Sequence, residues 1–509
     1  MEFINNNTTS IVSECFVQPH QYHHHACADS DERPPKHNSP FYLTPWDLYF
    51  INSQNHTQKG LLFAKPCESD QFMIDSLLDR LKHSLSLTLT HFCPLAGRIR
   101  TIQHENENGN ESPVSYCSFY VDCKDSPGVK FIHATSDLTI SDIISPPDDI
   151  VPRSAIRKFF HDDRELVDLH EKSLVTITVT ELVDGVFIGC SMNHIVADGN
   201  SFCHFFNMWS EIFQQALHHH HQHQPSTVDI SRPPVLNPWF PDGQGPLMKV
   251  PFNYENQTTA SSKLPDPSVN SSPNKDGVVI TKIFHFSSET ISKLKAKANA
   301  ECINCNCTNN NNNIIISSFQ SLSAFLWRSI TRARNLPPHQ INVFMLPVNN
   351  RSKLNPPLSE DYFGNSVGII VGGVTTTSEL LQNGLGWAAL KLHQAVVNYT
   401  DKEIRQWVDV WVQCPRTLNG NDRFREVEGN NNVSTLGIND FSKFNTIGNE
   451  FGLGKPLAFC SGMKGDKLSD GNMTIYSGRQ PGSVDVELCL YHHTISNLQS
   501  DHDFVQFLC

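Results

Sequence analysis

A polar stretch without apolar periodicity, residues 218–276, is the feature that most constrains the fold of this chain. It opens on a run of histidine and glutamine and continues rich in proline, serine and asparagine. Such a composition lacks the apolar residues that a packed core needs, and is typical of a connection between domains. On either side of it, strand-like and helix-like segments alternate irregularly. The sequence therefore predicts an α+β fold with an N-terminal domain at 1–217, a crossover linker at 218–276 and a C-terminal domain at 277–509.

In the N-terminal half, the clearest pattern is a hairpin that ends on a histidine. Leu174–Leu182 alternates valine and isoleucine with threonine, which is typical of a half-buried strand. Asp184-Gly185 is a hairpin signal, and the apolar run Val186–Met192 predicts a returning central strand. His194 is thus expected at the end of a rigid strand.

In the C-terminal half, the pattern predicts further strands and helices, but no glycine-rich phosphate loop. Asn383–Gln413 is expected to be helical, and the last helix is expected from about Asn497. Strands are expected near Leu457–Cys460, Met473–Tyr476 and Val484–Leu490.

Charge and cysteine usage exclude several classes of protein. The 39 Lys and Arg against 52 Asp and Glu give a formal net charge of −13, and without a basic stripe this argues against nucleic-acid binding. Apolar runs such as Val367–Val371 fall far short of the about 20 residues of a membrane span. The N-terminus lacks the apolar core of a secretory signal, and the 15 scattered cysteines suggest a reducing compartment. We expect a cytoplasmic monomer.

Two clusters resemble metal sites superficially, and no metal is expected at either. The histidines of 218–223 lack the spacing of a structural site, and Cys302, Cys305 and Cys307 have no second Cys/His pair nearby.

The aromatic series from Phe202 to Trp209 follows helical spacing and is most simply core. Trp239 and Phe240, in the linker, either border an acceptor pocket or pack structurally.

The segment His194-x-x-x-Asp198-Gly199 carries the candidate chemistry. A neutral imidazole takes a proton from a hydroxyl or an amine near neutral pH. Alternatively, a single histidine in a chain with 25 of them is a structural residue, and so short a motif also occurs by chance.

Five further motifs stand in a fixed order around this segment, and together they carry a specific resemblance. They are Leu43–Asp47, Pro94–Arg98, Val348–Arg351, Tyr362–Asn365 and Glu450–Pro456. With these motifs the chain resembles the plant BAHD acyl-CoA-dependent acyltransferases, from about residue 10 to the C-terminus. In its general sequence pattern, the chain is most similar to the branch of this family with cuticle- and defence-associated members.

The resemblance implies two chloramphenicol-acetyltransferase-like domains with a channel between them. His194 is then the general base that deprotonates a small-molecule acceptor for direct attack on the acyl-CoA thioester, in a ternary complex. Acyl-CoA is a co-substrate, and no metal or tightly bound cofactor is implied. Asp198 is implied to pair with Arg351 in a structural role, although its spacing from His194 also suggests a triad.

The resemblance also suggests donors for the oxyanion of the tetrahedral intermediate. Thr57, in a His-Thr pair, is a candidate donor, or else a turn residue. The family's Asp-Phe-Gly-Trp-Gly block is changed here, since leucine replaces the tryptophan and glutamate the aspartate; the block reads Glu450, Phe451, Gly452, Leu453 and Gly454. The leucine side chain has no hydrogen-bond donor. Losing one hydrogen bond to the oxyanion raises the activation free energy by about 1–3 kcal/mol, which lowers the rate roughly ten- to a hundred-fold.

Four polar residues near the C-terminus are candidates for CoA binding. Ser477, Arg479 and Ser483 match the part of the family that lines the channel, and Lys455 or Arg479 would contact the CoA phosphates. Both cations are alternatively ordinary surface charges.

Three functions remain open on these residues. The leading one is an O- or N-acyltransferase acting on a small plant metabolite. The change at Leu453 motivates a second, a lyase or cyclase that uses His194 as acid/base in the same channel. A binding or regulatory protein is the third, and the retained His194, Asp198 and Arg351 argue against it. A peptide-synthetase condensation domain usually has paired histidines, whereas this chain has Asn193 at the first position.

Overall fold

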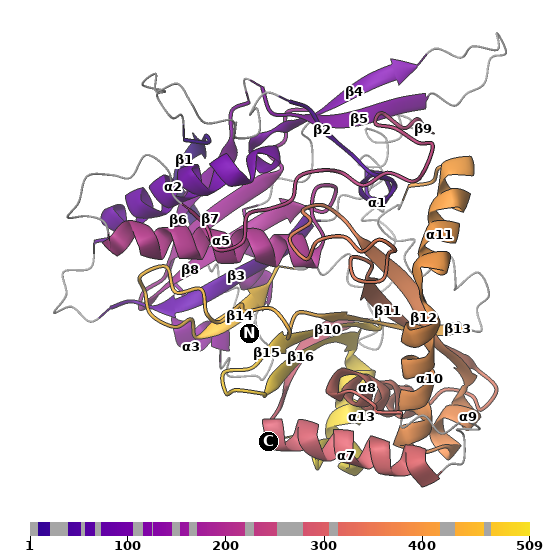
Figure 1. The fold of residues 1–509 in the computed structure, drawn as a ribbon. Coiled ribbons are helices and arrows are strands. Elements are labelled where there is room, and N and C mark those ends of the chain that lie inside the picture. Colours follow the sequence, from indigo (N-terminus) through magenta and orange to yellow (C-terminus); the bar gives the residue numbers. More distant parts are fainter. Residues whose placement is uncertain are drawn as a thin grey trace, which may run out of the picture.

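The structure is a computed structural model, and it describes thirteen stretches of the chain. These are residues 9–20, 39–51, 56–66, 73–104, 116–124, 126–144, 153–161, 170–218, 229–251, 278–304, 314–417, 433–462 and 470–508. Figure 1 shows two large sheets, each with helices packed against it, one in the upper and one in the lower part of the view. None of the helices in the described ranges combines the length and apolar character that crossing a bilayer requires.

The first sheet is built from the N-terminal half and one strand from the C-terminal half. Its order is β1 (Thr9–Val17), β6 (Val129–Ser136), β7 (Val175–Glu181), β8 (Gly185–Asn193), β3 (His56–Ala64) and β14 (Ala458–Ser461). All neighbours are antiparallel except β6 and β7. Two long helices, α2 (Ile74–His91) and α5 (Gly199–His218), pack side by side over this sheet (Figure 1).

The second sheet belongs to the C-terminal half. Its order is β10 (Val279–Phe286), β16 (Val484–Tyr491), β15 (Asn472–Ser477), β13 (Val433–Asp440), β11 (Ile341–Asn349) and β12 (Val367–Thr376). The pairs of β13 with β11 and with β15 are parallel, and the others are antiparallel. The helices beside it are α7 (Ser288–Asn304), α8 (Ser318–Ala333), α10 (Leu385–Asn398) and α13 (His492–Ser500).

A small third sheet and several short helices complete the described fold. The sheet has the order β2 (Phe41–Tyr42), β5 (Tyr116–Asp122), β4 (Arg98–His104), and β9 (Val250–Pro251) pairs with β5. The helices are α1 (Pro45–Leu48), the 3₁₀ turn η2 (Cys93–Ala96), α3 (Ile140–Ile144), α4 (Arg153–Lys158), α9 (Thr377–Gln382), α11 (Asp401–Gln413) and α14 (His502–Val505).

These sheets and helices confirm the mixed α and β fold class. The domain boundaries expected at residues 217 and 277 stay a prediction. Strand β14 shows that the two halves are interleaved, because it pairs antiparallel with β3 through Ala458 and Leu62. A segment of the C-terminal half therefore forms an edge of the N-terminal sheet.

The aromatic series on α5 is core, as its helical spacing predicted. Phe202, Phe205, Phe206 and Trp209 are all buried. They pack in the same cluster as Phe451 from the C-terminal half, whose ring centroid lies 4.6 Å from that of Trp209.

The segment Asn383–Gln413 is helical, as predicted, but it is divided into two helices. Thr400 begins α11 with a capping box, in which Glu403 accepts from the Thr400 amide at 2.9 Å. The other prediction, the start of the last long helix, was wrong. The last long helix begins at His492 rather than near Asn497. It follows directly on β16, where the His492 amide still donates to the carbonyl of Val278 at 3.0 Å.

Candidate active site

His194 lies directly after β8 and is held between an amide and an aromatic ring. Its Nδ1 is 3.1 Å from Oδ1 of Asn365, and its ring stacks on Phe50 with centroids 4.1 Å apart and planes at 23°. The histidine is half-buried, whereas Phe50 is buried. The imidazole therefore has a defined plane and one nitrogen facing an amide.

The Asn365 amide determines which ring nitrogen carries the proton. Its Nδ2 donates to the backbone carbonyl of His194 and to Oδ1 of Asp47, both at 2.8 Å. Both partners are acceptors, so the NH₂ group must face them, and the amide oxygen must face His194. An oxygen opposite Nδ1 requires Nδ1–H. The neutral imidazole then carries its lone pair on Nε2.

The turn between β8 and α5 is built by the motif itself. Oδ1 of Asn193 accepts from the Ile195 amide at 3.0 Å, which turns the chain at the strand end. Asp198 is the N-cap of α5, because its Oδ1 accepts from the Ser201 amide at 2.9 Å. At Gly199, a Cβ would approach the ring of Phe441 to 3.3 Å, so a larger residue would crowd this junction.

Asp198 faces Arg351. The guanidinium donates through Nη1 to Oδ2 at 2.8 Å and through Nη2 to Oδ1 at 3.2 Å. Oδ2 also accepts from the Ser366 amide at 3.0 Å. Burial alone would raise the pKa of Asp198, but Arg351 and these hydrogen bonds hold it below its ordinary value. Both carboxylate oxygens are thus engaged away from His194, which is the geometry of a structural pair rather than of a triad.

Thr57 lies on β3, the strand beside β8. It pairs with Met192, two residues before His194, and is half-buried. Diagonal neighbours of this kind are about 7–8 Å apart, within reach of a substrate held between them. The structure therefore brings Thr57 and His194 to the same end of two neighbouring strands.

The block from Glu450 to Gly454 packs against the middle of α5. Phe451 contacts the rings of Phe206 and Phe213, and the left-handed backbone of Gly452, with φ +72°, lies against Phe213. Phe206 and Phe213 are 7 and 14 residues from Gly199. With a rise of about 1.5 Å per residue, this contact lies roughly 10–20 Å along α5 from its N-terminus. Leu453 packs on the same core. The loss of an oxyanion donor at this position stays a prediction, and the contacts of Leu453 are those of a packing anchor.

The candidate CoA-binding residues gather around the β15–β16 turn. Ser477 Oγ donates to the Ser442 carbonyl at 2.9 Å, and Ser483 Oγ donates to the Gln480 carbonyl at 2.7 Å. Arg479 donates through Nε to the carbonyl of Leu457 at 2.7 Å, which ties the turn to the segment that follows Lys455. Both cations are exposed.

Comparison with known proteins identifies the family to which the chain belongs. The model of the transferase family matches residues 31–505. An Arabidopsis thaliana protein described as an uncharacterized acetyltransferase is 32% identical over 473 residues, covering 91% of this chain and 94% of that protein. The chain belongs to the BAHD acyltransferase family.

Solved structures show the same fold. Vinorine synthase has a TM-score of 0.62 at 18% identity and covers 98% of both chains. The TRI101 protein of F. graminearum, described as complexed with coenzyme A and T-2 mycotoxin, has a TM-score of 0.60 at 16% identity. That comparison covers 92% of this chain and 99% of TRI101. These likenesses confirm the two-domain fold expected for this BAHD protein.

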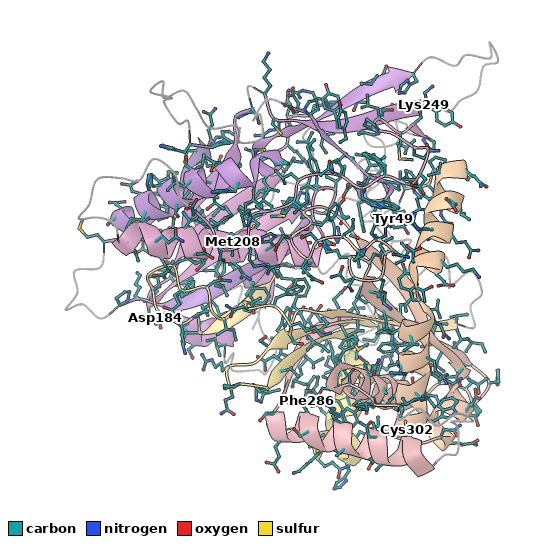
Figure 2. The ribbon with its side chains drawn as sticks, in the orientation of Figure 1. Tyr49, Asp184, Met208, Lys249, Phe286 and Cys302 are labelled. Atoms are coloured by element: carbon teal, nitrogen blue, oxygen red, sulfur yellow. The ribbon has the colours of Figure 1, made fainter. Side chains whose placement is uncertain are left out.

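Two residues of the site stood in motifs of the BAHD family without an assigned role, Asn365 and Asp47. A third, Phe50, was missed although it follows Asp47 by one helical turn. Its neighbour Tyr49 packs edge-on against Trp407 of α11, with centroids 5.6 Å apart. Figure 2 places Tyr49 beside α11, so the turn after α1 lies where the two halves meet.

Lys59 is a further residue that the sequence reading missed. It is buried, and its Nζ donates to Ser461 Oγ at 3.1 Å and to Tyr476 OH at 3.0 Å. The ammonium also lies 4.6 Å from the ring centre of Phe441. A signal existed, because strand alternation puts Lys59 on the inward face with Leu61 and Phe63. This cation joins the first sheet to the second.

The remaining candidates lie elsewhere. Within the described ranges, no group of three or more His, Cys, Asp or Glu side chains could hold a metal ion. Residues 219–223, Cys305 and Cys307 lie outside these ranges, and the buried Cys302 Sγ contacts the Gly386 carbonyl. Trp239 stacks on Trp46 with ring centroids 4.7 Å apart.

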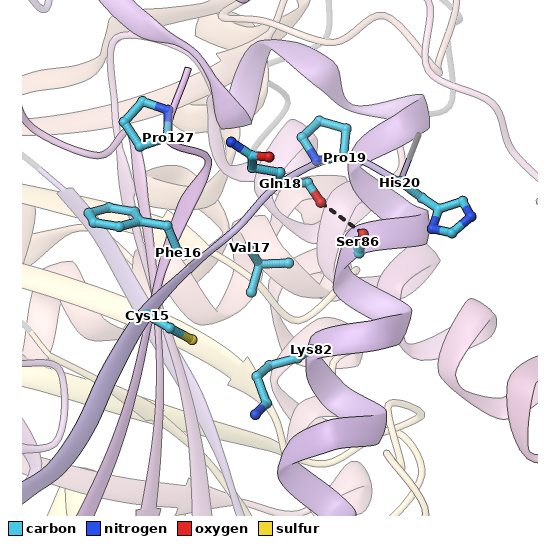
Figure 3. A pocket seen from close by; sticks show the side chains of 9 residues that line it. All are labelled: Cys15, Phe16, Val17, Gln18, Pro19, His20, Lys82, Ser86 and Pro127. Atoms are coloured by element: carbon cyan, nitrogen blue, oxygen red, sulfur yellow. Dashed lines mark hydrogen bonds between the residues drawn. The ribbon is translucent and has the colours of Figure 1, made fainter. Parts of the chain in front are cut away.

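An open hollow at the β1 edge of the first sheet is separate from His194. It is lined by Cys15–His20, Lys82, Ser86 and Pro127, and the Ser86 hydroxyl donates to the Gln18 carbonyl at 2.8 Å (Figure 3). Strand β1 is three strands from β8, about 14 Å at the usual strand spacing. The hollow therefore takes no part in the chemistry proposed for His194.

The packing of Leu453 leads to a prediction. We expect Leu453→Trp, which restores the family residue, to change kcat by less than about ten-fold, because the loop contacts α5 far from its N-terminus. Ten-fold corresponds to about 1.4 kcal/mol, the value of one hydrogen bond in the transition state. Steady-state kinetics of acyl transfer would check it, with Leu453→Phe as a control for bulk without a donor. A gain above ten-fold in the tryptophan variant alone would indicate that position 453 acts on the oxyanion.

Proposed function

We propose that this BAHD protein transfers an acyl group from acyl-CoA to a hydroxyl or amine of a small acceptor, expected to be a plant metabolite. His194 acts as general base in a ternary complex. The observation that carries the proposal is the hydrogen bond of His194 Nδ1 to the Asn365 amide oxygen, because it leaves the basic lone pair on Nε2. The acetyltransferase description of the Arabidopsis relative and the coenzyme A in the TRI101 structure support it.

The proposed reaction uses this geometry. Nε2 takes the proton of the acceptor O–H or N–H while the oxygen or nitrogen forms a bond to the thioester carbonyl carbon. The negative charge that develops on the carbonyl oxygen collapses, and the C–S bond breaks. His194 returns its proton to the leaving sulfur, which leaves an ester or amide and CoA thiol.

Thr57 is the donor that we propose for the oxyanion. Its position on β3 beside the end of β8 supports this role. We expect Thr57→Val to lower kcat about ten-fold, because one neutral hydrogen bond in the transition state is lost. Thr57→Ser is the matched control, since it keeps the hydroxyl and is expected to keep most of the activity. Equal kcat values for both variants in steady-state assays would contradict the role.

We place the CoA end at the β15–β16 turn, where Ser477, Arg479 and Ser483 meet the segment of Lys455. Two exposed cations in a chain with a formal net charge of −13 provide a local positive patch for phosphates. Acyl-CoA is then a co-substrate, with no tightly bound cofactor. A cytoplasmic location and a monomeric state are further predictions.

The proposed function is tested by its products. The protein is incubated with a pool of aliphatic and aromatic acyl-CoA thioesters and a pool of hydroxyl and amine acceptors. Free thiol release is followed with a thiol-reactive dye, and products are identified by untargeted mass spectrometry. Thiol release matched by new esters or amides, absent with His194→Ala, is the expected result. A product that forms with His194 but without any CoA thioester would instead support a lyase or cyclase.

A further inference from the structure

We propose that Asp47 is a positioning residue for His194 and acts through the Asn365 side chain. The inference rests on the proposed function of His194 as base, and it assigns a role to a carboxylate that touches neither the base nor its substrate. The juxtaposition joins three distant segments: Asp47 in α1, His194 after β8, and Asn365 before β12.

Asp47 is fully buried, and each of its two carboxylate oxygens binds a different residue. Oδ2 accepts from the amide and the hydroxyl of Thr44, at 2.8 and 2.7 Å, and so closes the capping box of α1. Oδ1 accepts from the backbone amide of Asn365 at 2.9 Å and from its Nδ2 at 2.8 Å. Four donors occupy the lone-pair sites of one carboxylate, so this group is matched to its ionised form.

Asp47 is one of the two acceptors that fix the orientation of the Asn365 side chain. If the amide were flipped, its oxygen would point at the Asp47 carboxylate and at the His194 carbonyl. Both of these groups are also acceptors, so neither contact would be a hydrogen bond. It would also turn the NH₂ group toward His194 Nδ1. That nitrogen would then have to be the acceptor, and the proton would move to Nε2. An ionised Asp47 therefore favours the tautomer in which Nε2 is basic.

The electrostatics of Asp47 are compatible with this role. Burial raises its pKa to about 6, although the hydrogen bonds of Thr44 and Asn365 oppose the rise. The carboxylate is therefore mostly ionised at neutral pH. Phe50, in the same turn, contacts His194 directly, because its ring stacks on the imidazole and limits rotation of the imidazole plane.

The chain offers a matched control. Thr139 and Asp142 form the same capping box on α3, where Asp142 Oδ2 accepts from the Thr139 amide at 2.8 Å and from its hydroxyl at 2.6 Å. Helix α3 lies at the Asp184–Gly185 turn, where the Ile140 amide donates to Asp184. This is the opposite end of β8 from His194, about 27 Å away along a nine-residue strand. Asp142→Ala removes a capping box without touching the base.

The experiment compares Asp47→Ala with Asp142→Ala in the full chain, with two readouts. The first is steady-state acyl transfer. We expect kcat to fall about 10- to 100-fold in Asp47→Ala, with the KM for acyl-CoA within about two-fold, because the base is misoriented and CoA binding is untouched. The second readout is ¹⁵N NMR of histidine-labelled protein, in which His194→Gln identifies the His194 signals. Protonated and unprotonated ring nitrogens have well-separated shifts.

We expect the wild type and Asp142→Ala to show the Nδ1–H tautomer, and Asp47→Ala to show a mixture of both tautomers. Wild-type kcat and an unchanged tautomer in folded Asp47→Ala would overturn the proposal. Where Asp47→Ala does not fold, Asp47→Val replaces it, because valine also offers Asn365 no acceptor, with the same two decisive results. If the wild type shows no His194-dependent acyl transfer, the proposed function fails, while the tautomer spectra still decide whether Asp47 orients His194.

Discussion

His194→Gln is expected to lower kcat for acyl transfer by about 10²- to 10⁴-fold, the usual contribution of a positioned general base. Glutamine keeps a polar side chain that can still face Asn365, so the fold and the KM for acyl-CoA should change little. The loss should appear mainly in kcat, because the proton of the acceptor has nowhere to go as the new bond forms. Steady-state kinetics over a range of acyl-CoA concentrations measures both constants.

His393→Gln is the control for this variant. His393 lies on α10, is half-buried, and also faces an amide oxygen, with Nδ1 3.4 Å from Gln320 Oε1. We expect the kcat of His393→Gln to stay within about two-fold of the wild type, since His393 contacts Gln320 of α8, which is not part of the candidate site. If His194→Gln retained activity at the level of His393→Gln, His194 would not be the base.

The second large effect is expected on stability. Asp198→Ala should lower the free energy of unfolding by about 3–5 kcal/mol, because it leaves the guanidinium of Arg351 buried without its carboxylate. Arg351 is fully buried, and Asp198 is nearly so. The variant also loses the N-cap of α5, which contributes about 1 kcal/mol. Urea unfolding followed by tryptophan fluorescence would give the change.

Two comparisons make this stability prediction decisive. Lys293→Met breaks the exposed pair with Glu289, whose atoms are 2.7 Å apart, and is expected to cost less than about 1 kcal/mol. The double variant Asp198→Leu/Arg351→Met removes both buried charges, so it should be less destabilised than Asp198→Ala. If Asp198→Ala lowered the free energy of unfolding no more than Lys293→Met does, the buried pair would not be what stabilises the junction between β8 and α5.

The pH dependence of the pair has a defined sign. The folded-state pKa of Asp198 is lowered, so the pair contributes stability above the ordinary aspartate range. That contribution is lost as pH falls through the folded-state value. The stability difference between wild type and Asp198→Asn should therefore be largest at neutral pH and shrink in acid, as urea midpoints across this range would show.

Much of the fold was readable from local patterns. The alternation in Leu174–Leu182 and the Asp184-Gly185 turn predicted β7 and β8, and with them the place of His194 at a strand end. The pair of Asp198 with Arg351 was implied by the family resemblance, and the structure shows that contact. The helix limits near Thr400 were missed, although the capping box that ends α10 and begins α11 was present as Thr400-x-x-Glu403.

The relation of Asn365 and Asp47 to His194 was beyond local patterns. Asn365 is 171 residues from His194 and 318 from Asp47 along the chain. Residues so far apart meet only when the two halves pack together, and no periodicity encodes which side chain will face which. Lys59 is the same case, because its partners Ser461 and Tyr476 come from the far end of the chain.

By itself, then, the sequence determined the strand-and-helix alternation, the family, and the placing of His194 at the end of β8. These follow from short-range periodicity, turn residues and ordered motifs, all of which are local properties. Only the tertiary structure decided which nitrogen of His194 carries the lone pair, that Asp47 binds the Asn365 amide, and that the Glu450–Gly454 block packs on α5. The physical reason is that hydrogen-bond direction and side-chain packing depend on groups that the chain brings together from distant segments.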